Sequence, residues 1–227
     1  MEIGRLGRRL GLWLALLVAA VWVGPAAAQD LTPAQRHFEQ GYAYQMGDGV
    51  KQDLEMALRH YREAIKLDPA MFEANVNAAQ LYFRRGELQY AMQYFSQAIT
   101  IARSREDIST EEEARACSDL GVCYFQKGSM KEAEQWFRFA IRRDPSLAEA
   151  HYNLINLLVK ENRVAEARQA MEVASRQAPS TRYGFFEGRL RSKESHEEWF
   201  PAWMQIAAAI FLGSLVAYAL YHRLTRQ

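Results

Sequence analysis

Apolar and small residues recur through the middle of the chain in a pattern that can be aligned on alanine. Its anchors are Ala57, Ala91, Ala133 and Ala167, which lie 34, 42 and 34 residues apart. In each copy a bulky apolar residue follows after four positions and a second alanine after seven; these are Tyr61, Phe95, Phe137 and Met171, and Ala64, Ala98, Ala140 and Ala174. Such spacings place residues on one face of an α-helix. The pattern therefore predicts amphipathic helices arranged as an internal repeat.

Turn-forming residues separate these stretches. Proline stands five positions after the second alanine in three copies, at Pro69, Pro145 and Pro179, and Arg103 takes that place in the second copy. Proline cannot continue a helix, so it separates one unit from the next. Gly86 and Gly128 lie between the helical stretches of the second and third copies, where glycine accepts a left-handed backbone. Each copy is therefore predicted to be a hairpin of two helices.

The upstream half of each copy completes a known signature. Leu120-Gly121-x-x-Tyr124 precedes the alanine motif and Pro145 in the third copy, and this text resembles the tetratricopeptide repeat (TPR) family. The resemblance extends over residues 34–181. It implies an all-α fold of about four stacked helical hairpins that share one core, a TPR solenoid. We assign residues 29–181 to this repeat domain.

The first copy is longer than the others. It has four extra residues between Tyr44 and Ala57, and its Gly47-Asp48-Gly49 text resembles a Sel-one-like repeat. The same loop offers only Asp48 and Asp53 as oxygen ligands, fewer than a calcium loop requires. We therefore predict no metal site there.

Two further departures fall later in the array. Eight residues, 106–113, precede the third copy and include Ser109 followed by the acidic run 111–113. They predict a capped first turn whose carboxylates face solvent. After the fourth copy, residues 182–200 combine aromatic, glycine and charged residues, which is consistent with either a capping segment or a juxtamembrane linker.

The resemblance implies a binding surface on the first helix of each hairpin. The residues at the corresponding positions are Phe38, Tyr42, Val76, Asn77, Gln80, Phe83, Arg84, Val122, Phe125, Tyr152, Asn153 and Asn156. A groove of aromatic side chains and amides suits a peptide or helix from a protein partner. Alternatively, some of these aromatics belong to the core between repeats. Phe38 and Tyr42 replace the lysine and asparagine of the subclass that clamps a C-terminal carboxylate, so that activity is not predicted.

The N-terminal end has the three parts of a secretory signal peptide, at residues 1–28. Arg5, Arg8 and Arg9 precede the uncharged stretch 10–23, and Ala28 ends a run of small residues after a glycine-proline pair. An uncleaved signal anchor is the alternative.

The C-terminal end predicts a transmembrane helix at residues 201–222. Residues 202–221 carry no charge and, at about 1.5 Å each, match the thickness of a bilayer. Arg223 and Arg226 follow the stretch, so the positive-inside rule places residues 223–227 in the cytoplasm and the repeats outside. We predict a bacterial inner-membrane protein with its repeat domain in the periplasm.

Composition removes several function classes. The chain has 227 residues, 49% of them hydrophobic, and a net charge of +1. The exported part, residues 29–201, has 23 basic and 26 acidic residues, which does not favour nucleic acid. The five histidines are scattered along the sequence, Cys117 and Cys123 cannot pair on one helix, and no catalytic motif is present. No enzyme activity, cofactor or metal is predicted.

These observations favour a protein-interaction scaffold that organises or assembles a membrane complex, with the lipid bilayer contacted through residues 202–221. Two alternatives remain open. The first is an accessory structural subunit that docks through its transmembrane helix, and the second is a periplasmic chaperone or biogenesis factor that binds clients transiently.

Overall fold

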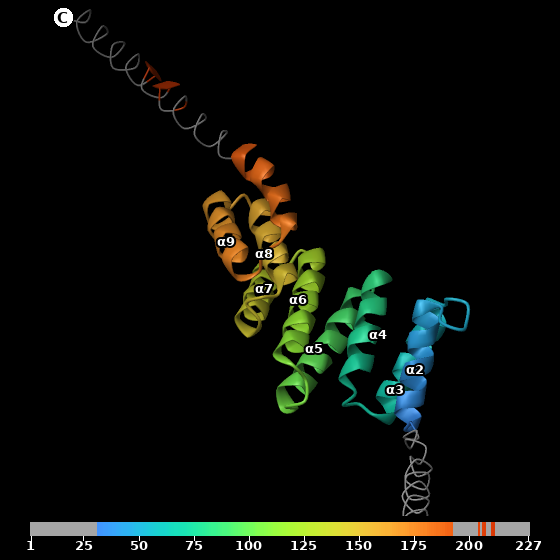
Figure 1. The fold of residues 1–227 in the computed structure, drawn as a ribbon. Coiled ribbons are helices and arrows are strands. Elements are labelled where there is room, and N and C mark those ends of the chain that lie inside the picture. The colour runs from blue at the N-terminus through green and yellow to red at the C-terminus, as the bar shows by residue number, and fades with distance from the viewer. Residues whose placement is uncertain (1–30, 193–203, 205, 208–209, 212–227) are drawn as a thin grey trace, which may run out of the picture. The chain divides into compact units, whose positions relative to one another are not determined.

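The computed structural model describes residues 31–192 together with 204, 206, 207, 210 and 211. These residues are helical or lie in turns and loops, with no strand among them (Figure 1). The helices are α2 (Pro33–Met46), α3 (Leu54–Leu67), α4 (Phe72–Arg84), α5 (Leu88–Ser104), α6 (Thr110–Lys127), α7 (Met130–Arg143), α8 (Ala148–Lys160), α9 (Val164–Gln177) and the 3-10 helix η1 (Thr181–Tyr183). Residues 184–192 are also helical. The chain divides into two compact units at residues 69 and 70.

The first unit contains the hairpin of α2 and α3. Thr32 and Gln35 form a capping box at the start of α2, and Asp53 accepts hydrogen bonds from two backbone amides at the start of α3. The two helices pack closely because Gly41 faces the Tyr61 ring. A Cβ atom at Gly41 would lie 2.8 Å from that ring, so only glycine fits there.

The second unit contains the hairpins α4–α5, α6–α7 and α8–α9. They are stacked in sequence, with α5 packed on α6 and α7 packed on α8 (Figure 1). Throughout the chain, both alanines of every repeat are fully buried, and Tyr61, Phe95 and Phe137 are almost fully buried beside them. The helical hairpins predicted from the alanine pattern are thus confirmed.

The turns inside the hairpins use left-handed backbone at equivalent places. Gly86 and Gly128 have φ values of 77° and 86°, as the sequence predicted. In the turn between α8 and α9 the left-handed position is held by Asn162, at φ 61°. Asparagine tolerates this conformation better than most residues with a side chain.

The inserted segment before α6 differs from the prediction in one respect. Ser109 and Glu112 form the expected capping box. Glu113, however, is buried, with only 2% of its surface exposed, whereas we predicted a solvated carboxylate. Its two oxygens accept hydrogen bonds from Arg103 of α5, at 3.1 Å, and Arg143 of α7, at 2.6 Å. The two arginines come from neighbouring helices, so the sequence of α6 alone does not predict that Glu113 is buried.

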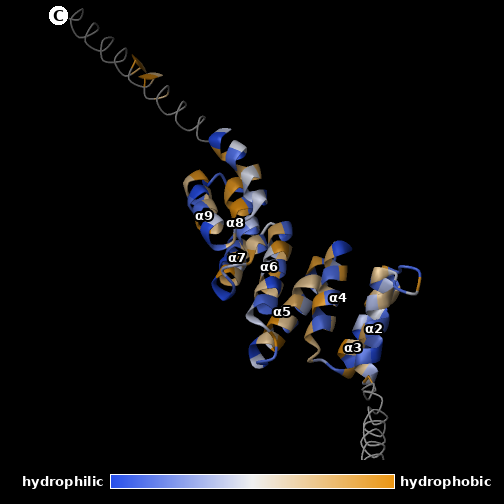
Figure 2. Ribbon diagram, viewed as in Figure 1, coloured by the Kyte–Doolittle hydropathy of each residue, from blue (hydrophilic) through white to orange (hydrophobic). Residues whose placement is uncertain are grey.

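The last hairpin is covered by the segment that follows it. Tyr183, Phe186 and Leu190 are buried in one hydrophobic cluster with residues of α8 and α9. The Tyr183 hydroxyl donates a hydrogen bond to the Ala178 carbonyl at 2.9 Å. Figure 2 shows the concentration of hydrophobic residues along α8, and this helix contributes Ile155 to the same cluster.

The predicted signal peptide at 1–28 and the cytoplasmic tail at 223–227 lie outside the described residues. So does nearly all of the predicted membrane span at 201–222. Among the residues that are described, no helix combines the length and apolar character needed to cross a membrane.

Candidate binding surface

Two of the predicted groove residues belong to the first unit. Phe38 is half-buried, and its ring lies 5.7 Å from that of Tyr61. Tyr42 is 43% exposed. Phe38 therefore contributes to the hairpin core as well as to the surface, whereas Tyr42 leaves much of its ring available for contact.

The other predicted residues lie on α4, α6 and α8 of the second unit. We call the surface made by these three helices the first-helix face. Its predicted residues on α4 are all half-buried except Arg84, which is exposed; the half-buried ones are Val76, Asn77, Gln80 and Phe83. The Gln80 side-chain amide donates a hydrogen bond to an Asp119 carboxylate oxygen at 3.3 Å. This bond connects α4 to α6.

Asp119 was not among the predicted residues. It holds the position on α6 that Asn77 holds on α4 and Asn153 on α8. Burial raises the pKa of its carboxyl group to about 6, although the hydrogen bond from Gln80 acts in the opposite direction. Of the two charged groups that act on it, Glu149 raises the pKa further and Arg115 lowers it. Alignment of the repeats could have identified Asp119, because it is a carboxylate at a position where two other copies have asparagine.

An amide also connects α6 to α8. The Asn153 side-chain nitrogen donates to the Ser118 hydroxyl at 3.2 Å, and Ser118 is buried. Asn156 lies one turn further along α8 and is half-buried. On the first-helix face, side-chain hydrogen bonds thus connect α4 to α6 through Asp119, and α6 to α8 through Ser118.

The aromatic residues of this face are partly engaged in packing. Phe125 and Tyr152 both pack against the hydrophobic cluster of α8 and α9, as does Val122. The Lys160 ammonium lies 4.4 Å from the centre of the Phe125 ring, and Arg182 lies 4.2 Å from that of Tyr152. The alternative that some predicted residues serve the core therefore holds for these side chains.

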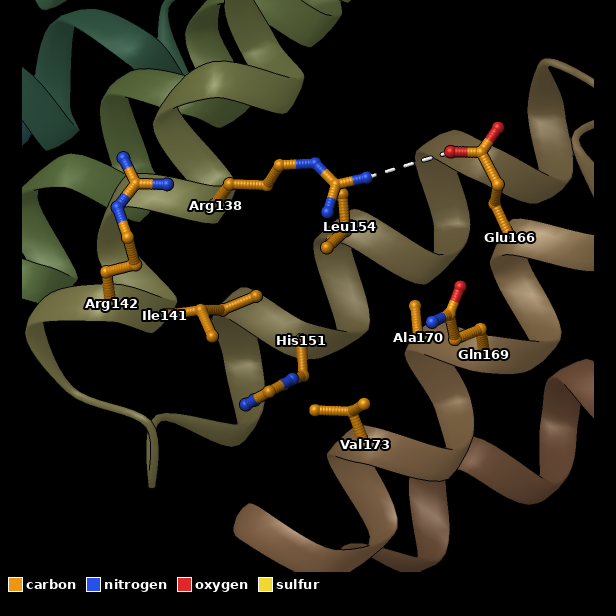
Figure 3. Close-up of a pocket in the computed structure, with 9 residues that line it drawn as sticks. All are labelled: Arg138, Ile141, Arg142, His151, Leu154, Glu166, Gln169, Ala170 and Val173. Atoms are coloured by element: carbon orange, nitrogen blue, oxygen red, sulfur yellow. Dashed lines mark ion pairs between the residues drawn. The ribbon is translucent and has the colours of Figure 1, made fainter.

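A separate cleft of about 290 Å³ lies among α7, α8 and α9 (Figure 3). Its apolar lining comes from Ile141, Leu154, Ala170 and Val173. Arg138 and Glu166 form an ion pair of 3.9 Å at its edge. His151 also lines the cleft, and burial lowers the pKa of its imidazole. The sequence did not predict this cleft, because its residues come from three helices.

The cysteines have no reactive environment. Cys117 and Cys123 are free and buried, in agreement with the sequence argument. Burial is the main cause that raises the pKa of both thiols to about 12, so they remain protonated at neutral pH. Within the described part of the chain, no group of three or more histidine, cysteine, aspartate or glutamate residues could hold a metal ion.

Comparison with known families identifies the repeats. Residues 71–146 match one family of tetratricopeptide repeats, and residues 137–180 match a second. The chain therefore contains tetratricopeptide repeats, which are generally protein-interaction scaffolds rather than enzymes.

One curated relative is similar in sequence over part of the chain. Stress-induced-phosphoprotein 1 of Caenorhabditis elegans is 30% identical over 118 residues, which are 51% of this chain. The match covers 36% of that protein, so the chain corresponds to little more than a third of its length.

Solved structures share the fold at low sequence identity. PilF of Pseudomonas aeruginosa superimposes with a TM-score of 0.59 and 19% identity, over 73% of this chain and 70% of PilF. YrrB, described as a TPR protein with an unusual peptide-binding site, gives 0.55 and 19%, over 73% and 78% of the chains. MamA gives 0.54 and 17%, over 73% and 93%. These likenesses establish the arrangement of helices alone.

Proposed function

We propose that this protein is an interaction scaffold that binds a segment of a protein partner on the first-helix face of α4, α6 and α8. The tetratricopeptide repeats support the general role. The partial exposure of Phe83, Arg84 and Asn156 supports this location, because they leave aromatic, cationic and amide groups accessible to a partner.

The observation that carries the proposal is the position of Asp119. Burial disfavours its ionised form, yet Asp119 is only half-buried on the first-helix face, where it accepts a hydrogen bond from the Gln80 amide. A side chain that opposes folding at neutral pH is retained more readily where it serves binding. Its carboxylate would accept hydrogen bonds from backbone amides, or from a lysine or arginine, of the bound segment.

We further propose that the repeats lie on the periplasmic side of a bacterial inner membrane and organise or assemble a membrane complex there. The proposal is supported by the arginine-rich start of the chain and by the apolar stretch at 202–221 followed by arginine. A reporter fused after Gln227 should be active in the cytoplasm and inactive in the periplasm. Periplasmic activity would overturn this topology.

The two alternatives differ in how the partner is held. An accessory subunit that docks through its transmembrane helix would be recovered with its neighbours at a fixed ratio, even when the first-helix face is altered. A periplasmic chaperone would recover clients that change with growth conditions. Crosslinking in native membranes followed by affinity purification separates these outcomes.

The binding surface is tested by a Phe83→Ala/Phe125→Ala double variant of the full-length protein. We expect partner recovery from membranes to fall at least about tenfold, since aromatic anchors contribute strongly to binding. Phe185→Ala is the matched control, because Phe185 is 61% exposed and lies outside the first-helix face. Circular dichroism checks folding. If helicity is intact and partner recovery is unchanged, the binding site lies on another surface, for example in the cleft among α7, α8 and α9.

A further inference from the structure

The first unit brings together two histidines that are 23 positions apart in the sequence. His37 lies on α2 and His60 on α3, and their Nδ1 atoms are 3.1 Å apart. Both rings are partly buried, and their centres are 5.4 Å apart. The sequence suggested only scattered histidines; the close packing of one hairpin makes them a pair.

Neighbouring contacts hold the His60 ring in place. The Tyr44 ring stacks on His60 at 5.5 Å, with an angle of 11° between the planes. The Tyr61 hydroxyl donates a hydrogen bond to the Gln45 side-chain oxygen at 2.7 Å. This bond holds α3 against α2 at the residue that follows His60. The His60 imidazole is thus positioned by a side chain that is not itself a ligand, as in preorganised metal sites.

We infer that His37 and His60 form a two-histidine binding site for a divalent transition-metal cation such as Zn²⁺ or Cu²⁺. Imidazole nitrogen is a preferred ligand of both ions. With bonds of 2.0–2.1 Å, two nitrogens on one ion lie about 3.3 Å apart in tetrahedral geometry and about 2.9 Å apart in square-planar geometry. The observed 3.1 Å between the Nδ1 atoms lies between these values. Water or a partner's side chain completes the coordination.

The proton balance of binding follows from the hydrogen bond. In the metal-free pair, one Nδ1 carries a proton and donates it to the other. Coordination uses both Nδ1 lone pairs, so that proton moves to Nε2 of its own ring and both imidazoles remain neutral. Burial, His37 and Arg59 lower the pKa of His60, in that order, which keeps this ring available as a neutral ligand. The positive charge of Arg59 also opposes the incoming cation.

The test is a Zn²⁺ titration of the tag-free full-length protein at pH 7.5 by isothermal calorimetry. We expect one Zn²⁺ per chain, and His37→Asn and His60→Asn should each weaken binding at least about tenfold. Arg59→Gln should tighten it by removing a nearby positive charge. His222→Asn removes a histidine from another part of the sequence and should leave binding unchanged.

Two further readouts separate ligation from misfolding. Zn²⁺ should raise the thermal midpoint of the wild type, because the ion binds the folded state, and should leave the midpoint of His60→Asn unchanged. Electron paramagnetic resonance of the Cu²⁺ form should show two coupled nitrogens. Failure of the wild type to bind either ion, or full binding by a folded His37→Asn/His60→Asn variant, would overturn the inference.

Discussion

The third and fourth repeats differ in the side chains that pack between the two helices of the hairpin. In the third, Gly121 leaves room for the ring of Phe137. At the corresponding positions the fourth repeat has Ile155, which is fully buried, and Met171, which packs on the same cluster. A small residue beside a large rigid one is exchanged for two of intermediate size. A β-branched residue in place of the glycine is thus accompanied by a flexible side chain in place of the rigid ring, and a flexible side chain can adjust to the larger neighbour.

The two repeats also differ in where they place carboxylates. Glu113 of the third repeat is buried between two arginines, whereas the equivalent residue of the fourth is the buried Leu147. On the first-helix face, Asp119 of the third repeat corresponds to Asn153 of the fourth. One repeat thus concentrates charge at two positions where its neighbour has neutral side chains. Since the fold tolerates both, the charges mark the third repeat as the specialised one.

The largest effect is expected from exchanging the packing residues. Gly121→Ile should destabilise the protein by about 3 kcal/mol, because the new Cβ would lie 2.7 Å from the Phe137 ring. Urea denaturation of the full-length protein measures this loss.

Two further variants test whether the loss of stability in Gly121→Ile comes from its contact with the Phe137 ring. Gly121→Ile/Phe137→Met transfers the pair of the fourth repeat and should recover most of the stability. Gly188→Ala should not destabilise the protein, since no atom beyond its own stretch of helix lies within 4 Å of its Cβ position. A double variant no more stable than Gly121→Ile would show that a flexible side chain at position 137 does not accommodate the isoleucine.

The next effect concerns Asp119. Its pKa of about 6 in the folded protein is higher than in the unfolded chain, so the folded state binds more protons between pH 4 and 6. The stability that this carboxyl group contributes therefore falls as pH rises through that range. Asp119→Asn should remove the fall and stabilise the protein by about 2 kcal/mol at pH 7.5. Asn153→Asp should have the opposite sign. Denaturation curves at pH 4.5 and 7.5 provide the comparison.

A smaller effect is expected at Glu113. Glu113→Gln removes the charge that Arg103 and Arg143 share and should lower stability by roughly 1–2 kcal/mol, since both arginines are nearly half exposed and remain hydrated. Glu113→Leu copies Leu147 of the fourth repeat and should be less harmful. If Glu113→Leu is the more damaging of the two by chemical denaturation, the equivalence of the positions fails.

The smallest effect is expected at the start of α6. The Ser109 hydroxyl accepts a hydrogen bond from the Glu112 backbone amide, whereas Leu147, the residue before α8, provides no side-chain cap. Ser109→Ala should cost about 1 kcal/mol in thermal or chemical unfolding. Ser129→Ala is the control, because Ser129 makes no capping hydrogen bond at the start of α7. If the two variants lose equal stability, the Ser109 cap does not stabilise α6.

The features that the sequence predicted are those repeated at a fixed spacing. Paired alanines such as Ala133 and Ala140, the aromatic between them, and the turn at Gly128 each recur in register, so one copy supports the reading of the next. Asp119 and Glu113 could not be recognised in this way. Their roles depend on which side chains of other helices meet them, and Gln80, Arg103 and Arg143 lie between 10 and 39 positions away.

The histidine pair illustrates the same limit within one hairpin. His37 and His60 have no common spacing with the other repeats, and their contact follows from how closely α2 and α3 pack around Gly41. Repetition in a sequence reveals what all copies need for folding. Residues that serve one copy only become visible when the helices are placed side by side.

The two thiols of α6 provide a natural measure of how often the third repeat opens. Cys117 and Cys123 are the chain's two cysteines, and both are buried with pKa values of about 12. The thiolate is the nucleophile that attacks an alkylating reagent, so each cysteine must become exposed and ionised before it reacts. The rate of labelling under native conditions therefore reports local opening of α6 without any engineered probe. A bound partner that holds α4, α6 and α8 together would slow that rate, so it could be detected before its identity is known.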